Sequence, residues 1–193
     1  MPHRFENAAE WSQVFDSAER DAWQKPDVVV EKLGLQEKEV VADIGAGTGY
    51  FAVRIAKRIP AGVVYAVDIE ADMERFVRAR ADKEGLKNLR AVTANANDPM
   101  LPEAVDLVLI VDTVHHIEDR NAYFAKVKTK LKPGGRIVIV DFKKEDTPVG
   151  PPLEMRLGPD DVIADLKKSG LIQTDIDEQT LPYQYILTFR AGP

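Results

Sequence analysis

The sequence predicts an α/β fold in which a mostly parallel β-sheet is covered by helices on both faces. Apolar strand-like runs alternate with helical patterns along most of the chain, which is the pattern of a parallel sheet with crossover helices. The apolar run 40–44 breaks into alternating glycines and resumes at helical spacing, which indicates strand, tight turn and helix. The next apolar run, 63–67, ends at Asp68.

The first 38 residues precede the first core strand and predict two helices. Residues 6–21 carry Trp11, Val14, Phe15 and Ala18 on one helical stripe. Pro26 suits the first turn of a second helix, which ends at Gly34. We interpret this pair as a cap packed on the sheet. The alternative is a lid over a ligand, in which Trp11, Phe15 or Trp23 touches substrate.

The remaining elements follow the same alternation to the end of the chain. Helices are expected at 50–58, 71–84, 119–131 and 160–168, and strands at 63–68, 89–93, 105–111, 136–140, 171–177 and 183–190. The last two strands are joined by a short turn and must pair antiparallel. We therefore predict a single domain over 1–193, with a helical cap over 1–38 and the core over 39–193.

The composition excludes several classes of partner. The chain has 26 basic and 32 acidic side chains, a net charge of −6, which argues against a nucleic-acid partner. Cysteine is absent, so there is no disulfide and no thiolate site for metal or catalysis. No apolar stretch reaches membrane-spanning length, and no apolar signal core follows the start. A cytoplasmic protein without membrane insertion is expected.

The glycine turn has the chemistry of a nucleotide site. Without side chains, backbone N–H groups at a helix N-terminus can approach a ligand closely. Asp68 follows Gly49 by 19 residues, about where a carboxylate accepts hydrogen bonds from ribose hydroxyls. The spacing is G-x-G-x-G, not the dinucleotide G-x-G-x-x-G, and Asp43 stands two residues before Gly45. A carboxylate there suits an amino group and a sulfonium better than a pyrophosphate, which favours an aminoacyl-nucleoside over NAD.

On these residues the chain resembles the class I S-adenosylmethionine (SAM) dependent methyltransferases, whose first motif is (D/E)-x-G-x-G-x-G. The run Leu131–Gly135 (L-K-P-G-G) matches that family's turn before strand five. The run Val114–Ile117 (V-H-H-I) is similar to small-molecule members such as the ubiquinone and menaquinone biosynthesis methyltransferases. The resemblance implies a Rossmann-like, seven-stranded sheet of order 3-2-1-4-5-7-6 with strand seven antiparallel.

The resemblance also implies a set of cofactor contacts, with S-adenosylhomocysteine as the product. The methionine and ribose side would be formed by Asp43, Gly45, Ala46, Gly47 and Gly49, and Asp68 would bind the ribose. The adenine would be bordered by Ile69 and Met73 and read by Asn95 beside Ala96, where the family usually has an acid; Asp98 could substitute. Asp112 would lie near the methionine amino group and the methyl.

Methyl transfer needs a base only if the acceptor must lose a proton. His115 follows strand four at the edge where ligands bind, so it is the candidate general base, with a structural role as the alternative. His116 should point elsewhere, into packing.

A catechol-type metal enzyme could use Asp112 and Asp141, but the Asp-Asn pair of those enzymes is Asp141-Phe142 here, so no metal is expected. Without an insertion for docking a macromolecule, the expected acceptor is a small molecule. The second hypothesis is a SAM-binding protein without turnover. Neither the acceptor nor an oligomeric state follows from the residues.

Overall fold

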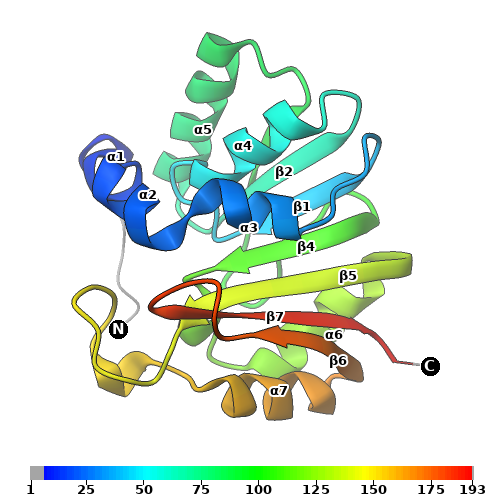
Figure 1. Ribbon diagram of the computed structural model, residues 1–193. Helices are drawn as coiled ribbons and strands as arrows, with labels where there is room; N and C mark the ends of the chain where they lie inside the picture. The colour runs from blue at the N-terminus through cyan, green and yellow to red at the C-terminus, as the bar shows by residue number, and fades with distance from the viewer. Residues whose placement is uncertain (1–6, 193) are drawn as a thin grey trace.

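The computed structural model describes residues 7–192 and contains one seven-stranded sheet of order β3-β2-β1-β4-β5-β7-β6 (Figure 1). The strands are β1 (Val40–Ile44), β2 (Val63–Asp68), β3 (Leu89–Thr93), β4 (Val105–Val111), β5 (Leu131–Phe142), β6 (Leu171–Asp177) and β7 (Gln184–Ala191). Strands β1 to β5 pair in parallel, and β7 runs antiparallel to both β5 and β6. The predicted fold class and strand order are confirmed.

Helices cover both faces of the sheet and create two separate apolar cores. On one face lie α3 (Pro26–Lys32), α4 (Tyr50–Arg58) and α5 (Ala71–Glu84), and on the other α6 (Arg120–Thr129) and α7 (Pro159–Lys168) (Figure 1). Strand residues alternate between the two cores: Val41 and Leu109 pack with the α3–α5 side, and Ala42 and Ile110 with the α6–α7 side. Burial on both faces explains why these strands are almost continuously apolar.

The cap differs from the expected arrangement at its first helix. One helix was expected over 6–21, of which Glu6 lies outside the described residues; the structure has α1 (Ala8–Phe15) and α2 (Ala18–Gln24) instead. The break falls at Ser17, whose extended backbone and side-chain oxygen cap α2 by accepting the Arg20 N–H at 3.2 Å. A good N-cap residue therefore overrode the continuous apolar stripe.

The L-K-P-G-G turn is also placed differently from the expectation. Strand β5 begins at Leu131 rather than at Arg136, and the turn residues form an irregularity inside it. Val105 pairs with Leu131 and Leu107 already pairs with Arg136, so β5 bulges out and returns. Gly134 makes this possible with a φ of 79°.

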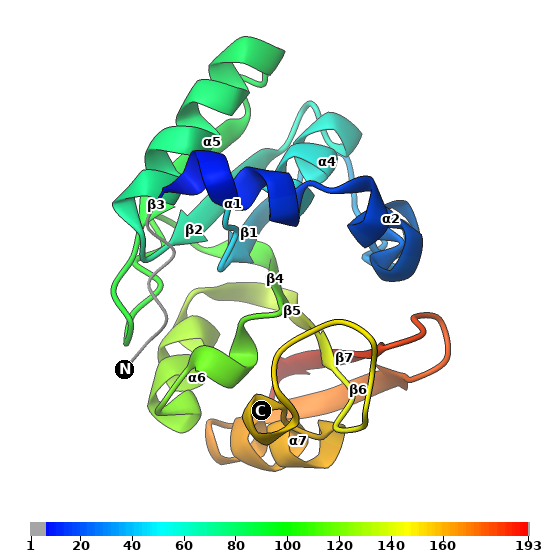
Figure 2. The same ribbon diagram turned by 90° about the vertical axis from the view of Figure 1, so that its left-hand side faces the viewer.

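The loop after β5 is held by one buried side chain, Arg156, which follows the short turn η2 (Leu153–Met155). Its guanidinium donates to the carbonyl oxygens of Pro151 at 2.8 Å, Glu145 at 2.7 Å and Val149 at 3.2 Å. It also lies over the ring of Phe142, 5.2 Å from the centroid. The loop therefore has a defined course across the carboxyl ends of the strands, opposite α1 and α2 (Figure 2).

The parallel strands bring the predicted site residues to one edge of the sheet. Ile44 pairs with Val67 on one side and Ile110 on the other, so the glycine turn, Asp68 and Asp112 follow three adjacent strands at the same level. Ligands bind at this edge in open parallel sheets. Within residues 7–192, no helix combines the length and apolar character needed to cross a membrane.

Gly45 provides a stability test of the turn. A β-carbon there would stand 2.2 Å from Thr113 Oγ1, at a φ of 75°; at Gly85, φ is 68° but no atom lies within 4 Å. We expect Gly85→Ala to lower the free energy of unfolding by about 1 kcal/mol through backbone strain, and Gly45→Ala by about 2–5 kcal/mol through strain and overpacking. Urea unfolding measures both, and equal losses would contradict the close packing of Gly45.

Candidate functional site

The glycine turn is fixed by backbone hydrogen bonds to the neighbouring strand. The N–H groups of Gly45 and Ala46 both donate to the carbonyl of Val67, at 2.8 and 3.0 Å. Gly45, Gly47 and Gly49 all have positive φ, at 75°, 53° and 83°. Glycine adopts this region without strain, so the sequence specifies a turn that directs α4 from the end of β1.

Asp68 ties the turn to the end of β2. One carboxylate oxygen accepts the Gly47 N–H at 2.8 Å, and the other accepts the Glu70 N–H at 3.0 Å. Burial raises the pKa of Asp68, and the hydrogen bonds from Glu70, Gly47 and Ile69 oppose that effect. The structure therefore brings together the turn and the acid that the sequence analysis assigned to one ribose site.

Asp43 is a buried carboxylate beneath the same turn, with 2% of its surface exposed. Burial raises its pKa to about 7, against the Ala52 backbone hydrogen bond and the charge of Arg20, while the charge of Asp68 raises it further. A cation brought near this carboxylate would favour its ionised form.

Asp112 anchors a group of polar side chains that we call the Asp112 cluster: Arg20, Gln24, Asp112 and Gln184. Gln24 Nε2 donates to Asp112 at 3.1 Å and to Gln184 Oε1 at 2.9 Å, and Arg20 Nη2 lies 3.4 Å from Asp112. Gln184 donates to the second oxygen of Asp112. Burial raises the pKa of Asp112 to about 6, and the charge of Arg20 opposes it. The φ of Asp112 is 53°, an uncommon value for a residue other than glycine.

His115 and Asp141 form a buried pair beside this cluster. His115 lies in the short helix η1 (Val114–His116), which follows β4, and Asp141 lies near the end of β5. Nδ1 of His115 is 2.9 and 3.0 Å from the two Asp141 oxygens, with side chains 3% and 0% exposed. Burial lowers the pKa of His115, but the hydrogen bond and charge of Asp141 and the charge of Asp112 outweigh it, so the pKa is raised.

His116 is exposed rather than packed inside, which corrects the expectation for that residue. The two histidine rings lie with centroids 4.2 Å apart, and Nδ1 of His115 is directed to Asp141.

The residues expected at the adenine side lie on two elements. Met73 is buried in α5, and Ile69, just before it, is 50% exposed. Asn95 and Ala96 are exposed in the loop after β3, where the backbone of Asn95 forms an antiparallel bridge with Asp98. This places Asp98 beside Asn95.

The first helix covers the glycine turn. A β-carbon at Gly47 would lie 3.4 Å from the ring of Phe15, and Phe15 stacks on Trp11 with centroids 5.3 Å apart. Asp16 is held by Arg80 of α5 at 3.0 Å. The cap thus lies against the turn itself, where Figure 2 shows α1 crossing the strand ends.

A buried hydroxyl under this cap suits a polar ligand. Thr48 Oγ1 is buried and has no hydrogen-bond partner among the described residues. A buried hydroxyl without a partner costs free energy, about 1–3 kcal/mol. The Thr48 hydroxyl, the bare backbone of the glycine turn and the carboxylates of Asp43 and Asp112 can all form hydrogen bonds with a ligand. This combination fits a ligand with hydroxyl and amino groups.

The carboxylates at this edge are engaged with protein donors. Asp141 accepts from His115 and from the Phe142 N–H, while Asp112 accepts from its cluster. Across residues 7–192, no three His, Cys, Asp or Glu side chains gather in an arrangement that could hold a metal ion.

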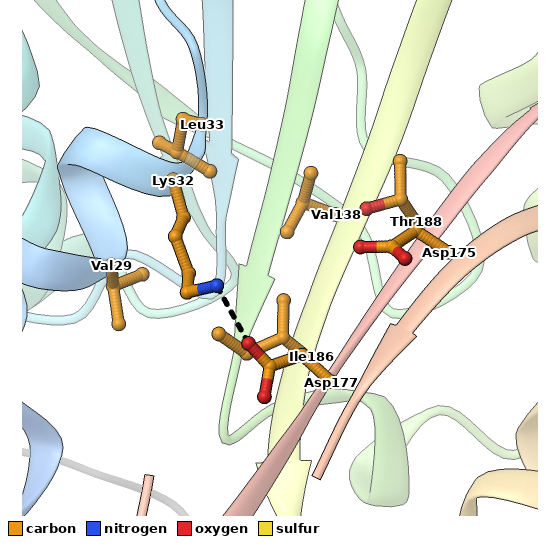
Figure 3. Close-up of a pocket in the computed structure, with 8 residues that line it drawn as sticks. All are labelled: Val29, Lys32, Leu33, Val138, Asp175, Asp177, Ile186 and Thr188. Carbon is orange, nitrogen blue, oxygen red and sulfur yellow. Dashed lines mark ion pairs between the residues drawn. The ribbon is translucent and has the colours of Figure 1, made fainter. Parts of the chain in front are cut away.

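A small cavity of about 70 Å³ lies away from this site, between α3 and the middle of β5, β6 and β7 (Figure 3). Lys32 reaches across it to Asp177, with 2.7 Å between Nζ and Oδ2. None of the predicted site residues lines it.

Sequence reasoning missed three residues of the Asp112 cluster. Arg20 and Gln24 come from the cap, and Gln184 from the start of β7, far from the motifs in the chain. For Arg20 the only signal was a polar residue on a helix with an apolar stripe, and such residues are usually solvent-exposed.

Comparison with known proteins identifies the class that this fold and site define. A family model described as a methyltransferase domain matches residues 35–181, and the chain belongs to this family. A SAM-dependent methyltransferase structure from Aquifex aeolicus is 25% identical, covers 95% of this chain and 97% of its own, and superposes with a TM-score of 0.86.

Two curated relatives match about three fifths of the chain. An uncharacterized methyltransferase from Mycobacterium tuberculosis is 35% identical over 60% of this chain and 57% of its own length. The ubiquinone/menaquinone biosynthesis C-methyltransferase of Hahella chejuensis is 28% identical over 62% of this chain and 49% of its own. The predicted resemblance to this group is confirmed, and the chain spans about half the length of these relatives.

Asp43 gives a pH test of the buried charge. Its folded-state pKa of about 7 exceeds the unfolded value of 3.8, so the folded protein retains a proton that the unfolded chain releases. This contribution to stability is present at low pH and is lost as pH rises from 3.8 towards 7.

We therefore expect wild type to lose stability relative to Asp43→Asn over that range, by up to about 4 kcal/mol. Urea unfolding of both proteins from pH 4 to 8 measures the difference, and parallel pH profiles would contradict it.

Proposed function

We propose that the protein is a SAM-dependent methyltransferase that acts on a small-molecule acceptor. The observation that carries the proposal is the convergence of the glycine turn, Asp68, Asp43 and Asp112 at the carboxyl edge of three adjacent strands. The family and the full-length similarity to the Aquifex structure support the same activity.

The residues present fit the cofactor by their donor chemistry. We propose that Asp68 binds the ribose hydroxyls, that Gly45, Ala46, Gly47 and Gly49 supply close backbone, and that Asp112 pairs with the amino group. Ile69, Met73, Asn95 and Ala96 would border the adenine. When bound, SAM supplies a methyl group on a sulfonium, which an acceptor nucleophile can attack without metal or redox help.

His115 is the proposed general base, and Asp141 the residue that positions it. A neutral imidazole donates from one ring nitrogen and accepts at the other, so bonding of Nδ1 to Asp141 leaves Nε2 as the base. The raised pKa makes His115 a stronger base once it is neutral. Removing a proton from a hydroxyl or an ammonium of the acceptor would generate the nucleophile. If His115 acts as the base, the acceptor must carry a removable proton on the atom that is methylated.

Calorimetric titration with SAM and with S-adenosylhomocysteine tests the cofactor. We expect dissociation constants on the order of 1–100 µM for both, because the site offers paired charges and bare backbone. With SAM established, small phenols, amines and quinols can be screened by S-adenosylhomocysteine release. Absence of binding contradicts the proposal, and binding without release across the screen favours the non-catalytic SAM-binding protein.

The base assignment predicts different effects for the two adjacent histidines. We expect His115→Gln to lower kcat about 10²–10⁴-fold with unchanged S-adenosylhomocysteine affinity, and the exposed control His116→Gln to have little effect. In wild type, kcat/KM should rise with pH through an apparent pKa above 6.5, because the raised pKa keeps His115 protonated below it.

Asp141→Asn removes the charge that raises the His115 pKa. It should shift this rising limb to lower pH and reduce its plateau. A purely structural role for Asp141 would lower the plateau without moving the limb, and full turnover of His115→Gln would contradict the base.

A further inference from the structure

Arg20 is the cationic member of the Asp112 cluster, and it comes from the cap rather than from the sheet. It lies in the first turn of α2, with its guanidinium stacked on the ring of Tyr50, 4.1 Å from the centroid. Tyr50 is the first residue of α4, directly after the glycine turn. Arg20 therefore stands between the turn on one side and Asp112 on the other.

The guanidinium is held firmly at two of its nitrogens and loosely at the third. Nη1 donates to the Phe15 carbonyl at 3.0 Å and Nε donates to Gln24. Nη2 lies 3.4 Å from Asp112, whereas a charge-assisted hydrogen bond is usually about 2.7–2.9 Å. The contact with Asp112 is thus the weakest of the three, and it can be exchanged while Arg20 stays in place.

Charge balance around Arg20 favours a ligand that carries both signs. Asp43 and Asp112 both interact with its charge, and the side chains of Arg20 and Asp112 are 16% and 24% exposed. A lone anion at Arg20 would leave Asp112 without its cation, and a lone cation at Asp112 would displace Arg20 without a new partner. An α-amino acid group satisfies both, because its ammonium pairs with Asp112 and its carboxylate with Arg20.

We propose that Arg20 binds the carboxylate of the cofactor's amino acid moiety and so makes the cap part of the cofactor site. This rests on the proposed function. Nη2, the nitrogen that faces Asp112, can donate to the carboxylate, and the stack on Tyr50 fixes the plane of the guanidinium. Cofactor recognition then depends on the position of α2, which also carries Gln24 of the same cluster.

Three ligands isolate the role of Arg20: S-adenosylhomocysteine, its decarboxylated analogue, and 5′-methylthioadenosine, which lacks the amino acid moiety. We expect Arg20→Ala to weaken S-adenosylhomocysteine binding about 10–100-fold and to leave 5′-methylthioadenosine binding unchanged. Removing the carboxylate should weaken binding to wild type by a similar factor and to Arg20→Ala hardly at all. Calorimetry measures all six affinities.

Arg54→Ala is the matched control. Arg54 also stacks on Tyr50, at 4.2 Å, and holds α2 through Asp21 at 3.1 Å, but it does not contact Asp112 in the contacts described. We expect it to affect the three ligands equally and slightly. Arg20→Lys keeps the positive charge and perturbs folding less than Arg20→Ala. It should restore part of the preference for S-adenosylhomocysteine over its decarboxylated analogue.

The outcomes separate the two proposals. Wild type that binds none of the three ligands contradicts the proposed function, and the role of Arg20 with it. If wild type binds S-adenosylhomocysteine and Arg20→Ala lowers the affinity for all three ligands by the same factor, only the role of Arg20 is contradicted. Arg20 then has a structural role. Equal loss on decarboxylation in wild type and Arg20→Ala would also contradict only the role of Arg20.

Discussion

The hydrogen bonds from Gly45 and Ala46 to the carbonyl of Val67 are the constraint on which the site depends. They extend the pairing of β1 and β2 past the last strand residue, so the chain must reverse there with backbone that only glycine adopts easily. Asp68 then receives the Gly47 N–H. In this way strand pairing, an interaction general to all sheets, places the acid and the turn in register.

Negative charge is concentrated at the same edge, and its counter-charges come from elsewhere. Asp43, Asp112 and Asp141 lie at or near the ends of adjacent strands, and Asp112 and Asp141 directly follow the paired residues Val111 and Val140. Arg20 contacts Asp112, and His115 contacts Asp141. Because Arg20 belongs to the cap, the balance of charge links the N-terminal helices to the sheet, and the cap has a physical role beyond covering apolar surface.

Local signals account for what could be predicted from the sequence. Apolar runs, glycine spacing and capping residues predicted the strands, α4 and α5, because each signal lies within the element that it determines. The order of the strands in the sheet was predicted from the family resemblance instead. The prediction for the cap was wrong at Ser17, where an N-cap residue interrupts a longer apolar stripe. The prediction for β5 was wrong at the start of the strand, where a bulge has the sequence pattern of a turn. Arg20, Gln24 and Gln184 could not be predicted, since the contacts that join the two cap residues to Asp112 and Gln184, and Gln184 to Asp112, span 72 to 160 residues, and no spacing rule connects them. The roles of the cofactor and base residues stay predictions.

The contacts of Arg156 determine which substitutions the loop after β5 can accept. It holds the loop after β5 through main-chain carbonyl oxygens, which every residue type possesses, and through the Thr147 hydroxyl. The loop's path therefore depends little on its own side chains, with four exceptions. Thr147 contacts Arg156, Lys143 and Lys144 contact Pro182 and Asp161, and a β-carbon at Gly150 would meet the ring of Phe142. Such a loop can accept new side chains at the rim of the site while its backbone stays the same. One buried arginine thus makes this segment a natural place to redesign selectivity by substitution alone.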